Sequence, residues 1–154
     1  MDLELKNKVA IVGGASKGLG RACAEVLAGE GVRVVMCSRT KADLAQAAQE
    51  IRGATGVDVL DFAGDLERHD TIRALIAAAV ERFGQLDILV NNSGGPPLAK
   101  SCSATEEQWA TAVQRSLLYF ARMSREALPH LKRSGSGRII NILASTVYQP
   151  IANL

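Results

Sequence analysis

The residues best suited to chemistry near the start of the chain form a glycine-rich stretch at 14–20, Gly-Ala-Ser-Lys-Gly-Leu-Gly. A short apolar run ends just before it at Val12, and a helical pattern begins near Leu19. Glycine permits a tight turn, and its missing Cβ lets the backbone approach a ligand closely. A helix N-terminus presents unpaired N–H groups that favour an anion. The stretch therefore predicts a phosphate-binding loop rather than a turn with incidental glycines.

The glycine spacing, G-x-x-x-G-x-G, separates this loop from two commoner patterns. It is not G-x-G-x-x-G, and no Gly-Lys-Ser/Thr follows as in a P-loop, so hydrolysis of a nucleoside triphosphate is disfavoured. Between a strand and a helix, such a loop favours the pyrophosphate of a dinucleotide. The loop residues predicted to bind this cofactor are Gly14, Ser16, Lys17, Gly18, Leu19 and Gly20.

The end of the second predicted strand indicates which dinucleotide is preferred. An Asp or Glu about twenty residues past such a loop usually binds the ribose 2′-hydroxyl of NAD. Here Ser38 and Arg39 stand at the strand end without an acid, and Lys17 lies in the loop. One close ion pair with a 2′-phosphate would contribute about 4 kcal/mol before desolvation. We therefore predict NADP(H), with NAD(H) as the alternative if both cations are only solvated surface residues.

Short apolar runs alternate with longer helical patterns and must position these residues. The runs expected to be strands cover 9–12, 32–37, 57–62, 88–90 and 138–143. Continuous apolar runs are typical of strands that are buried on both faces of a parallel sheet. With right-handed crossovers, the order predicts a three-layer, doubly wound α/β fold, Rossmann-like and incomplete at its C-terminal side. We expect one dinucleotide-binding domain over residues 1–154.

Three helical patterns are clear enough to predict which residues face inward. A middle helix over 72–83 shows the i, i+3, i+4, i+7 repeat. A long helix is expected to open at Thr105, which has capping-box spacing to Gln108. The apolar positions of the first helix are Leu19, Cys23, Val26 and Leu27, and those of the long helix are Trp109, Ala112, Val113, Leu117 and Phe120.

Composition narrows the class of protein further. A net charge of +2, without a run of Lys or Arg, gives no case for a nucleic acid or an anionic membrane as partner. The three cysteines lack a metal-binding spacing and are expected to be reduced thiols. The first residues lack the apolar region of a secretory signal. We therefore expect a cytoplasmic protein without a metal site.

Taken together, the motifs resemble the short-chain dehydrogenase/reductase family, whose loop is T-G-x-x-x-G-x-G. Gly13 stands where that family usually has threonine. Residues 64–66 resemble the segment with the family's Asp-Val/Leu pair, which holds the adenine ring, and residues 91–94 resemble its N-N-A-G segment, which lines the cofactor groove. The resemblance runs from about Leu5 to Leu154. It adds these predicted cofactor contacts: Asp65, Leu66, Asn92, Ser93 and Gly94.

The catalytic side departs from the family pattern. In the family a tyrosine is the general acid/base, a lysine lowers its pKa, a serine orients the substrate oxygen, and an asparagine supports a proton relay. The asparagine position is occupied by Ser116, which is expected to face inward on its helix. The strand 138–142 resembles the one that leads to the catalytic serine, but that position is Ala144. Ser145 follows directly and could serve after a one-residue shift, or it could be an ordinary loop serine.

The family's Y-x-x-x-K pair would fall beyond Leu154. Tyr148 comes too early, with no lysine four residues later, and Tyr119 is interpreted as a packing residue. We therefore expect a chain that is the N-terminal part of a longer enzyme, or else a non-catalytic relative.

The resemblance implies an NADP(H)-dependent oxidoreductase that transfers a hydride between nicotinamide and a small carbonyl or alcohol substrate. The alternative is a dinucleotide-binding pseudoenzyme or sensor. The family commonly pairs through the helix after Thr105, which implies a homo-oligomer, a dimer or tetramer.

Overall fold

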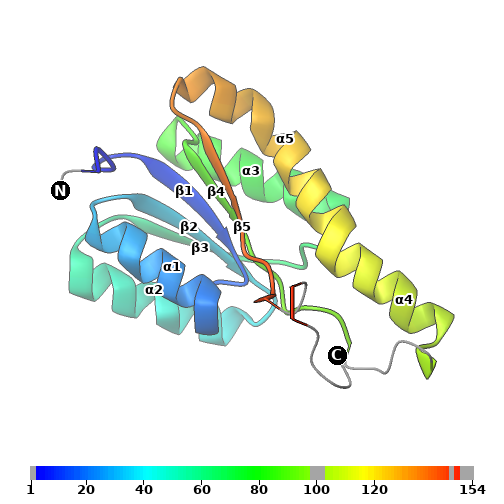
Figure 1. Cartoon of the computed structure of the whole chain (residues 1–154). Helices are drawn as coiled ribbons and strands as arrows, with labels where there is room; N and C mark the ends of the chain where they lie inside the picture. Colours follow the sequence, from blue (N-terminus) through cyan, green and yellow to red (C-terminus); the bar gives the residue numbers. More distant parts are fainter. Residues whose placement is uncertain (1–2, 98–102, 146–147, 150–154) are drawn as a thin grey trace.

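The structure is a computed structural model that describes residues 3–97, 103–145 and 148–149. Strands and helices alternate along the chain (Figure 1). In chain order they are β1 (Val9–Gly13), α1 (Gly18–Gly29), β2 (Arg33–Ser38), α2 (Lys41–Thr55), β3 (Val59–Ala63), α3 (His69–Phe83), β4 (Ile88–Asn91), α4 (Glu106–Val113), the π-helix η2 (Gln114–Leu118), α5 (Tyr119–Ser134) and β5 (Arg138–Asn141).

The described strands form one parallel five-stranded sheet in the order β3-β2-β1-β4-β5. The chain moves outward from β1 to β3 and then returns to place β4 on the other side of β1. This reversal puts α1 and α2 on one face and α3 and α5 on the other (Figure 1). The predicted doubly wound, three-layer fold is thereby confirmed. Ile139 and Ile140 of β5 remain 40% and 44% exposed, in keeping with a sheet that is incomplete on this side.

Alternate residues of the central strands build a separate core on each face of the sheet. Val9 and Ile11 of β1 pack with α3 and α5, whereas Ala10 and Val12 pack with α1 and α2. Successive side chains of a strand point to opposite faces, so an uninterrupted apolar run serves both cores. This is why the apolar runs in the sequence correctly predicted buried parallel strands.

The buried face of α1 differs from the predicted one. Leu19 and Val26 are 67% and 68% exposed, while Gly20, Ala24 and Ala28 are buried. These three small residues recur every fourth position and form a stripe on which the helix can approach the sheet closely. Hydrophobicity alone predicts that the large residues face the core, whereas close packing of the helix on the sheet requires the small ones there.

The helix predicted from Thr105 is divided by η2. The capping box is present as predicted: the Gln108 backbone N–H donates to Thr105 Oγ1 at 3.2 Å, and the Thr105 N–H donates to Gln108 Oε1 at 2.9 Å. In η2 the Tyr119 N–H donates to the Gln114 carbonyl, one residue further back than in an α-helix. The extra residue rotates the face that follows, and this rotation separates the buried side of α5 from the predicted stripe.

As a result, the apolar stripe of α4 and η2 faces outward. Trp109 and Leu117 are 51% and 61% exposed, and Ser116 is exposed as well. The expectation that Ser116 faces inward is therefore wrong. The residues that α5 buries are Tyr119, Met123, Ala127 and Leu131.

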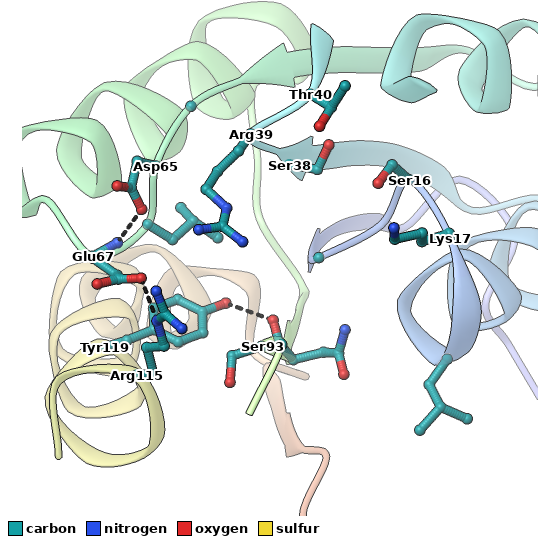
Figure 2. A pocket seen from close by; sticks show the side chains of 16 residues that line it. Ser16, Lys17, Ser38, Arg39, Thr40, Asp65, Glu67, Ser93, Arg115 and Tyr119 are labelled. Carbon is teal, nitrogen blue, oxygen red and sulfur yellow. Dashed lines mark hydrogen bonds and ion pairs between the residues drawn. The ribbon is translucent and has the colours of Figure 1, made fainter. Parts of the chain in front are cut away.

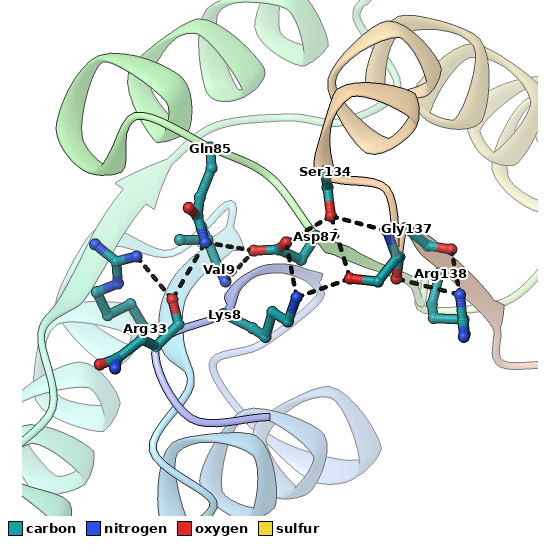
Figure 3. Close-up of polar contacts among 10 residues, drawn as sticks. Lys8, Val9, Arg33, Gln85, Asp87, Ser134, Gly137 and Arg138 are labelled. Carbon is teal, nitrogen blue, oxygen red and sulfur yellow. Dashed lines mark hydrogen bonds and ion pairs between the residues drawn. The ribbon is translucent and has the colours of Figure 1, made fainter. Parts of the chain in front are cut away.

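At the end of the sheet where the strands begin, Asp87 connects several elements (Figure 3). It immediately precedes β4 and is 3% exposed. Its Oδ2 accepts hydrogen bonds from the Val9 backbone N–H and from Gln85 Nε2, both at 2.8 Å. Its Oδ1 accepts from the Ser134 hydroxyl at 2.6 Å and lies 3.7 Å from Lys8 Nζ. One carboxylate therefore ties β1 and β4 to the end of α5.

Candidate functional site

A cavity of about 420 Å³ opens at the carboxyl ends of the strands, beside the neighbouring strands β1 and β4 (Figure 2). Open doubly wound sheets bind ligands in the crevice at this position. The residues that line it are Gly14, Ser16, Lys17, Leu19, Ser38, Arg39, Thr40, Gly64, Asp65, Leu66, Glu67, Asn92, Ser93, Gly94, Arg115 and Tyr119.

The glycine loop has the geometry of an anion cradle. Gly14 and Gly18 both have φ of +59°, a conformation that residues with a side chain rarely adopt. A Cβ on Gly20 would clash with the Gly14 carbonyl oxygen and lie 2.8 Å from Asn92 Nδ2. At the start of α1 the N-cap residue Lys17 makes no capping hydrogen bond with its side chain. The first N–H groups of the helix are thus available to a pyrophosphate, and a bare backbone surrounds them.

Asn92 joins this loop to the end of β4. Its Nδ2 donates to the Gly13 carbonyl at 3.1 Å, and a Cβ on Gly14 would come within 2.7 Å of the same nitrogen. Because the glycines leave no side chain between the loop backbone and the Asn92 amide, the loop and Asn92 hold each other in place.

The end of β2 presents polar groups that have no partner in the described part of the chain. Ser38 is 9% exposed, and its Oγ makes no hydrogen bond with any described residue. Arg39 extends into the cavity, and Lys17 faces it from the start of α1 (Figure 2). A buried hydroxyl without a partner is costly, so a ligand that hydrogen-bonds to Ser38 would remove that cost. The residues present therefore fit a ligand that hydrogen-bonds to Ser38 and whose negative charge Arg39 and Lys17 would stabilise.

The opposite wall is built by the loop after β3 and by η2. The Glu67 backbone N–H donates to Asp65 Oδ1 at 3.0 Å, which shapes the turn after the strand. Arg115 Nε then donates to Glu67 Oε1 at 2.7 Å, and Gln114 Nε2 donates to the Glu67 carbonyl at 2.7 Å. These contacts bring η2 over the cavity.

Most of the cofactor residues predicted from the sequence meet in this cavity. Gly18 and Gly20 do not line it but shape the loop behind it. Sequence reasoning missed Thr40, Gly64, Glu67, Arg115 and Tyr119 as lining residues. Gly64 belongs to the 64–66 motif without having been predicted as a contact, and nothing local in the sequence indicates that Arg115 reaches the loop after β3.

Tyr119 has a more specific position than the predicted packing role. Its ring lies in the core beside α3, and the residue is 2% exposed. Its hydroxyl nevertheless reaches the cavity wall, where it donates to the Asn92 carbonyl at 3.4 Å. Burial, the largest cause, raises the pKa of this phenol, so the hydroxyl stays protonated as a donor.

The predicted catalytic serines do not meet in the cavity. Ser116 is exposed on η2, and Ser145 is exposed after β5, where its carbonyl accepts from the Tyr148 and Gln149 backbone N–H groups. Neither residue lines the cavity, and Ala144 is exposed as well. The central part of the loop after β4, at 98–102, and the segment 150–154 lie outside the described residues.

Two features are absent from the described residues, a membrane-spanning helix and a metal-binding group. None of their helices is long and apolar enough to cross a membrane. Their side chains include no group of three or more His, Cys, Asp or Glu arranged to hold a metal ion.

Comparison with known families agrees with this fold and cavity. The family model for short chain dehydrogenases matches residues 8–154, and the chain belongs to this family of oxidoreductases.

Its relatives are named as reductases and dehydrogenases of different kinds. A putative ketoacyl reductase of Streptomyces coelicolor is 37% identical over 142 residues, which cover 91% of this chain and 54% of the relative. The 1,6-dihydroxycyclohexa-2,4-diene-1-carboxylate dehydrogenase of Pseudomonas putida is 38% identical over 143 residues, with coverage of 92% and 52%. Among solved structures, L-sorbose reductase from Gluconobacter frateurii, complexed with NADPH and L-sorbose, matches with a TM-score of 0.95 at 31% identity, covering 99% of this chain and 58% of that one. The chain thus spans little more than half the length of these proteins.

Proposed function

We propose that residues 1–154 form the dinucleotide-binding domain of an NADP(H)-dependent oxidoreductase, which transfers a hydride between nicotinamide and a carbonyl or alcohol group of a small molecule. The observation that carries the cofactor preference is the end of β2, where residues 36–41 include no acid, Arg39 lies across the cavity from Lys17, and the Ser38 hydroxyl has no partner among the described residues. L-sorbose reductase and a variant of actinorhodin polyketide ketoreductase, both solved with NADPH, support the proposal as relatives.

Each part of the cavity has a defined task in this proposal. The loop at 14–20 and the start of α1 bind the pyrophosphate, because bare N–H groups and the helix dipole stabilise negative charge there. Lys17, Ser38 and Arg39 bind the 2′-phosphate, and a guanidinium can bind it with two parallel hydrogen bonds. Asp65 and Leu66 hold the adenine, and residues 92–94 line the path toward the nicotinamide. The bound dinucleotide supplies or accepts the hydride.

The test is a comparison of NADPH with NADH binding after Lys17→Ala and Arg39→Ala are combined. Hydrogen bonds to charged groups are worth about 1.5–3 kcal/mol each, so the Kd for NADPH should rise by roughly a hundredfold or more. The Kd for NADH should change less than about threefold, because NADH lacks the 2′-phosphate. Fluorescence titration of the reduced cofactors measures both constants.

A matched control for this experiment is Arg125→Ala. Arg125 is an α5 cation whose side chain is 67% exposed and which does not line the cavity. Its removal changes the net charge by the same sign and should leave both constants unchanged. Equal losses of NADPH and NADH affinity in the Lys17/Arg39 variant would contradict the proposed preference.

A second candidate is a dinucleotide sensor without turnover. It is favoured by Ser116 and Ala144 at the family's asparagine and serine positions, since neither residue lines the cavity. The gene sequence downstream of the Leu154 codon separates the two candidates. A Y-x-x-x-K pair there, together with NADPH oxidation by the full-length protein on added carbonyl compounds, supports the enzyme; cofactor binding without either supports the sensor.

We also propose that the protein is a cytoplasmic homo-oligomer, a dimer or tetramer. Trp109, Val113 and Leu117 form an exposed apolar stripe on α4 and η2, and large apolar stripes often mark protein interfaces. The free thiols of Cys23 and Cys37 are in keeping with a reducing compartment. Sedimentation velocity of the full-length protein tests the oligomer, and a monomer at micromolar concentration would contradict it.

A further inference from the structure

Gly13, the last residue of β1, is glycine for a reason of space. Its φ is not among the positive values that require glycine, so its backbone conformation would tolerate a side chain. A Cβ at this position, however, would clash with the Tyr119 hydroxyl. The next nearest atoms are the backbone oxygen of Asn92 at 3.0 Å, a tight contact that a small shift of the backbone would have to relieve, and Leu66 Cδ1 at 3.4 Å, an ordinary contact. The Tyr119 hydroxyl is therefore the main obstacle to a side chain at this position.

This hydroxyl is held firmly by the elements around it. The Tyr119 ring packs edge-to-face on Phe120 with centroids 5.1 Å apart, and the residue belongs to the core between the sheet, α3 and α5. Tyr119 also closes the π turn of η2, since its backbone N–H donates to the Gln114 carbonyl. The rotation produced by this turn directs Tyr119 inward and fixes the point that its hydroxyl reaches.

Asn92 connects this hydroxyl to the glycine loop. Its carbonyl accepts from Tyr119 at 3.4 Å, and its Nδ2 donates to the Gly13 carbonyl at 3.1 Å. The same amide is the atom against which Gly14 and Gly20 pack. A path of contacts therefore runs from α5 through the end of β4 to the loop at 14–20.

We propose that Tyr119 is a positioning residue for the dinucleotide: its hydroxyl fills the space beside Gly13 and holds the Asn92 backbone, so that the glycine loop keeps the shape that receives the pyrophosphate. Gly13 and Tyr119 act as a coupled pair, in which a side chain at position 13 excludes the hydroxyl. The threonine that the family usually carries at this position would need the same space. This inference rests on the proposed dinucleotide binding.

The experiment is a double-mutant cycle with Gly13→Ala, Tyr119→Phe and their combination, read by the Kd for NADPH and by the urea midpoint. Loss of one neutral hydrogen bond predicts a three- to tenfold weaker Kd for Tyr119→Phe. Gly13→Ala should weaken binding more, because its Cβ displaces the hydroxyl and with it Asn92. Combining the two should bind at least threefold tighter than Gly13→Ala alone, since phenylalanine removes the clashing atom.

Two variants serve as matched controls. Tyr148→Phe removes a hydroxyl from a residue that is 94% exposed, and Gly53→Ala adds a Cβ that meets no atom within 4 Å. Both should leave the Kd for NADPH unchanged.

The outcomes separate this inference from the proposed function. If the unmodified protein binds no NADPH or NADH, the proposed function fails, and the coupling of Gly13 and Tyr119 is read from the urea midpoints alone. If it binds NADPH but the losses of the single variants simply add, the pair is not coupled and the inference is wrong. A Tyr119→Phe variant with a lower urea midpoint but an unchanged Kd would likewise overturn it, because Tyr119 would then be only a packing residue.

Discussion

Cys37 illustrates how a single side chain is governed by its surroundings. It is fully buried in the core that the sheet shares with α3 and α5, and its Sγ lies 3.8 Å from the Gly64 carbonyl oxygen. Burial raises the pKa of this thiol from 9.0 to about 12, and the negative charge of Asp65 adds to the shift. At neutral pH the residue is therefore an inert part of the core rather than a nucleophile.

Two measurements at the residue scale follow for Cys37. Native protein at pH 8 should be alkylated by iodoacetamide at the partly exposed Cys23 well before Cys37, as peptide mapping would show. Because the unfolded thiol ionises first, the free energy of unfolding is unaffected by ionisation of Cys37 below pH 9 and falls as the pH rises toward 12. Replacing Cys37 with alanine should therefore reduce the fall of the urea midpoint between pH 8 and pH 10.5; an unchanged slope, or early labelling of Cys37, would contradict this.

At the scale of single elements, the two helix starts at Thr105 and Thr40 differ although both N-cap residues are threonine. Thr105 completes a capping box, whereas the Thr40 side chain makes no capping hydrogen bond. The difference agrees with the sequence, since Gln108 stands three residues after Thr105 and can return a hydrogen bond to it. α4 buries none of its residues, so its cap carries an unusual share of its stability.

Thr105→Ala should therefore loosen α4 specifically. Loss of a cap costs about 1 kcal/mol, which corresponds to roughly fivefold faster exchange of the α4 backbone amides. Thr40→Ala should change the exchange of the α2 amides by less than about twofold, because no cap bond is lost. Amide hydrogen exchange by NMR measures both, and equal effects at the two helices would contradict the assignment.

At the scale of the whole molecule, the two edges of the sheet have different tasks. The carboxyl edge carries the cavity with its unpartnered polar groups, and the opposite edge is joined by the Asp87 network (Figure 3). Asp87 touches β1, the start of β4 and the end of α5, so it holds the sheet together while leaving the cavity edge open.

Asp87→Ala should lower the free energy of unfolding by about 3 kcal/mol or more, because the buried Val9 N–H and the part-buried Ser134 hydroxyl lose their acceptor. Asp58→Ala is the matched control: its carboxylate pairs with Arg82 at 2.7 Å but is 44% exposed, and such pairs contribute less than about 1 kcal/mol. Urea unfolding measures both. Under folding conditions the Kd for NADPH of the Asp87 variant should match that of the unmodified protein; a small stability loss at Asp87 would sink the assigned role.

The sequence by itself determined the features that depend only on residues close together along the chain. The glycine spacing, the apolar runs and the Thr105–Gln108 pair each express a local physical need, so they predicted the loop, the parallel strands and the capping box. The buried side of a helix was harder to predict. In α1 the buried residues Gly20, Ala24 and Ala28 are only weakly hydrophobic, and no pattern in the sequence marks the π turn of η2.

Only the tertiary structure decided which distant residues meet. The Arg115–Glu67 pair and the contact of Tyr119 with Gly13 arise because the sheet order places η2 and α5 beside the ends of β1, β3 and β4. The sequence does not show why position 13 is a glycine, and it indicates only a packing role for a tyrosine within a helix. Their relation becomes visible when the fold brings a hydroxyl into the space of a missing Cβ, since steric exclusion depends on positions in space rather than on separation along the chain.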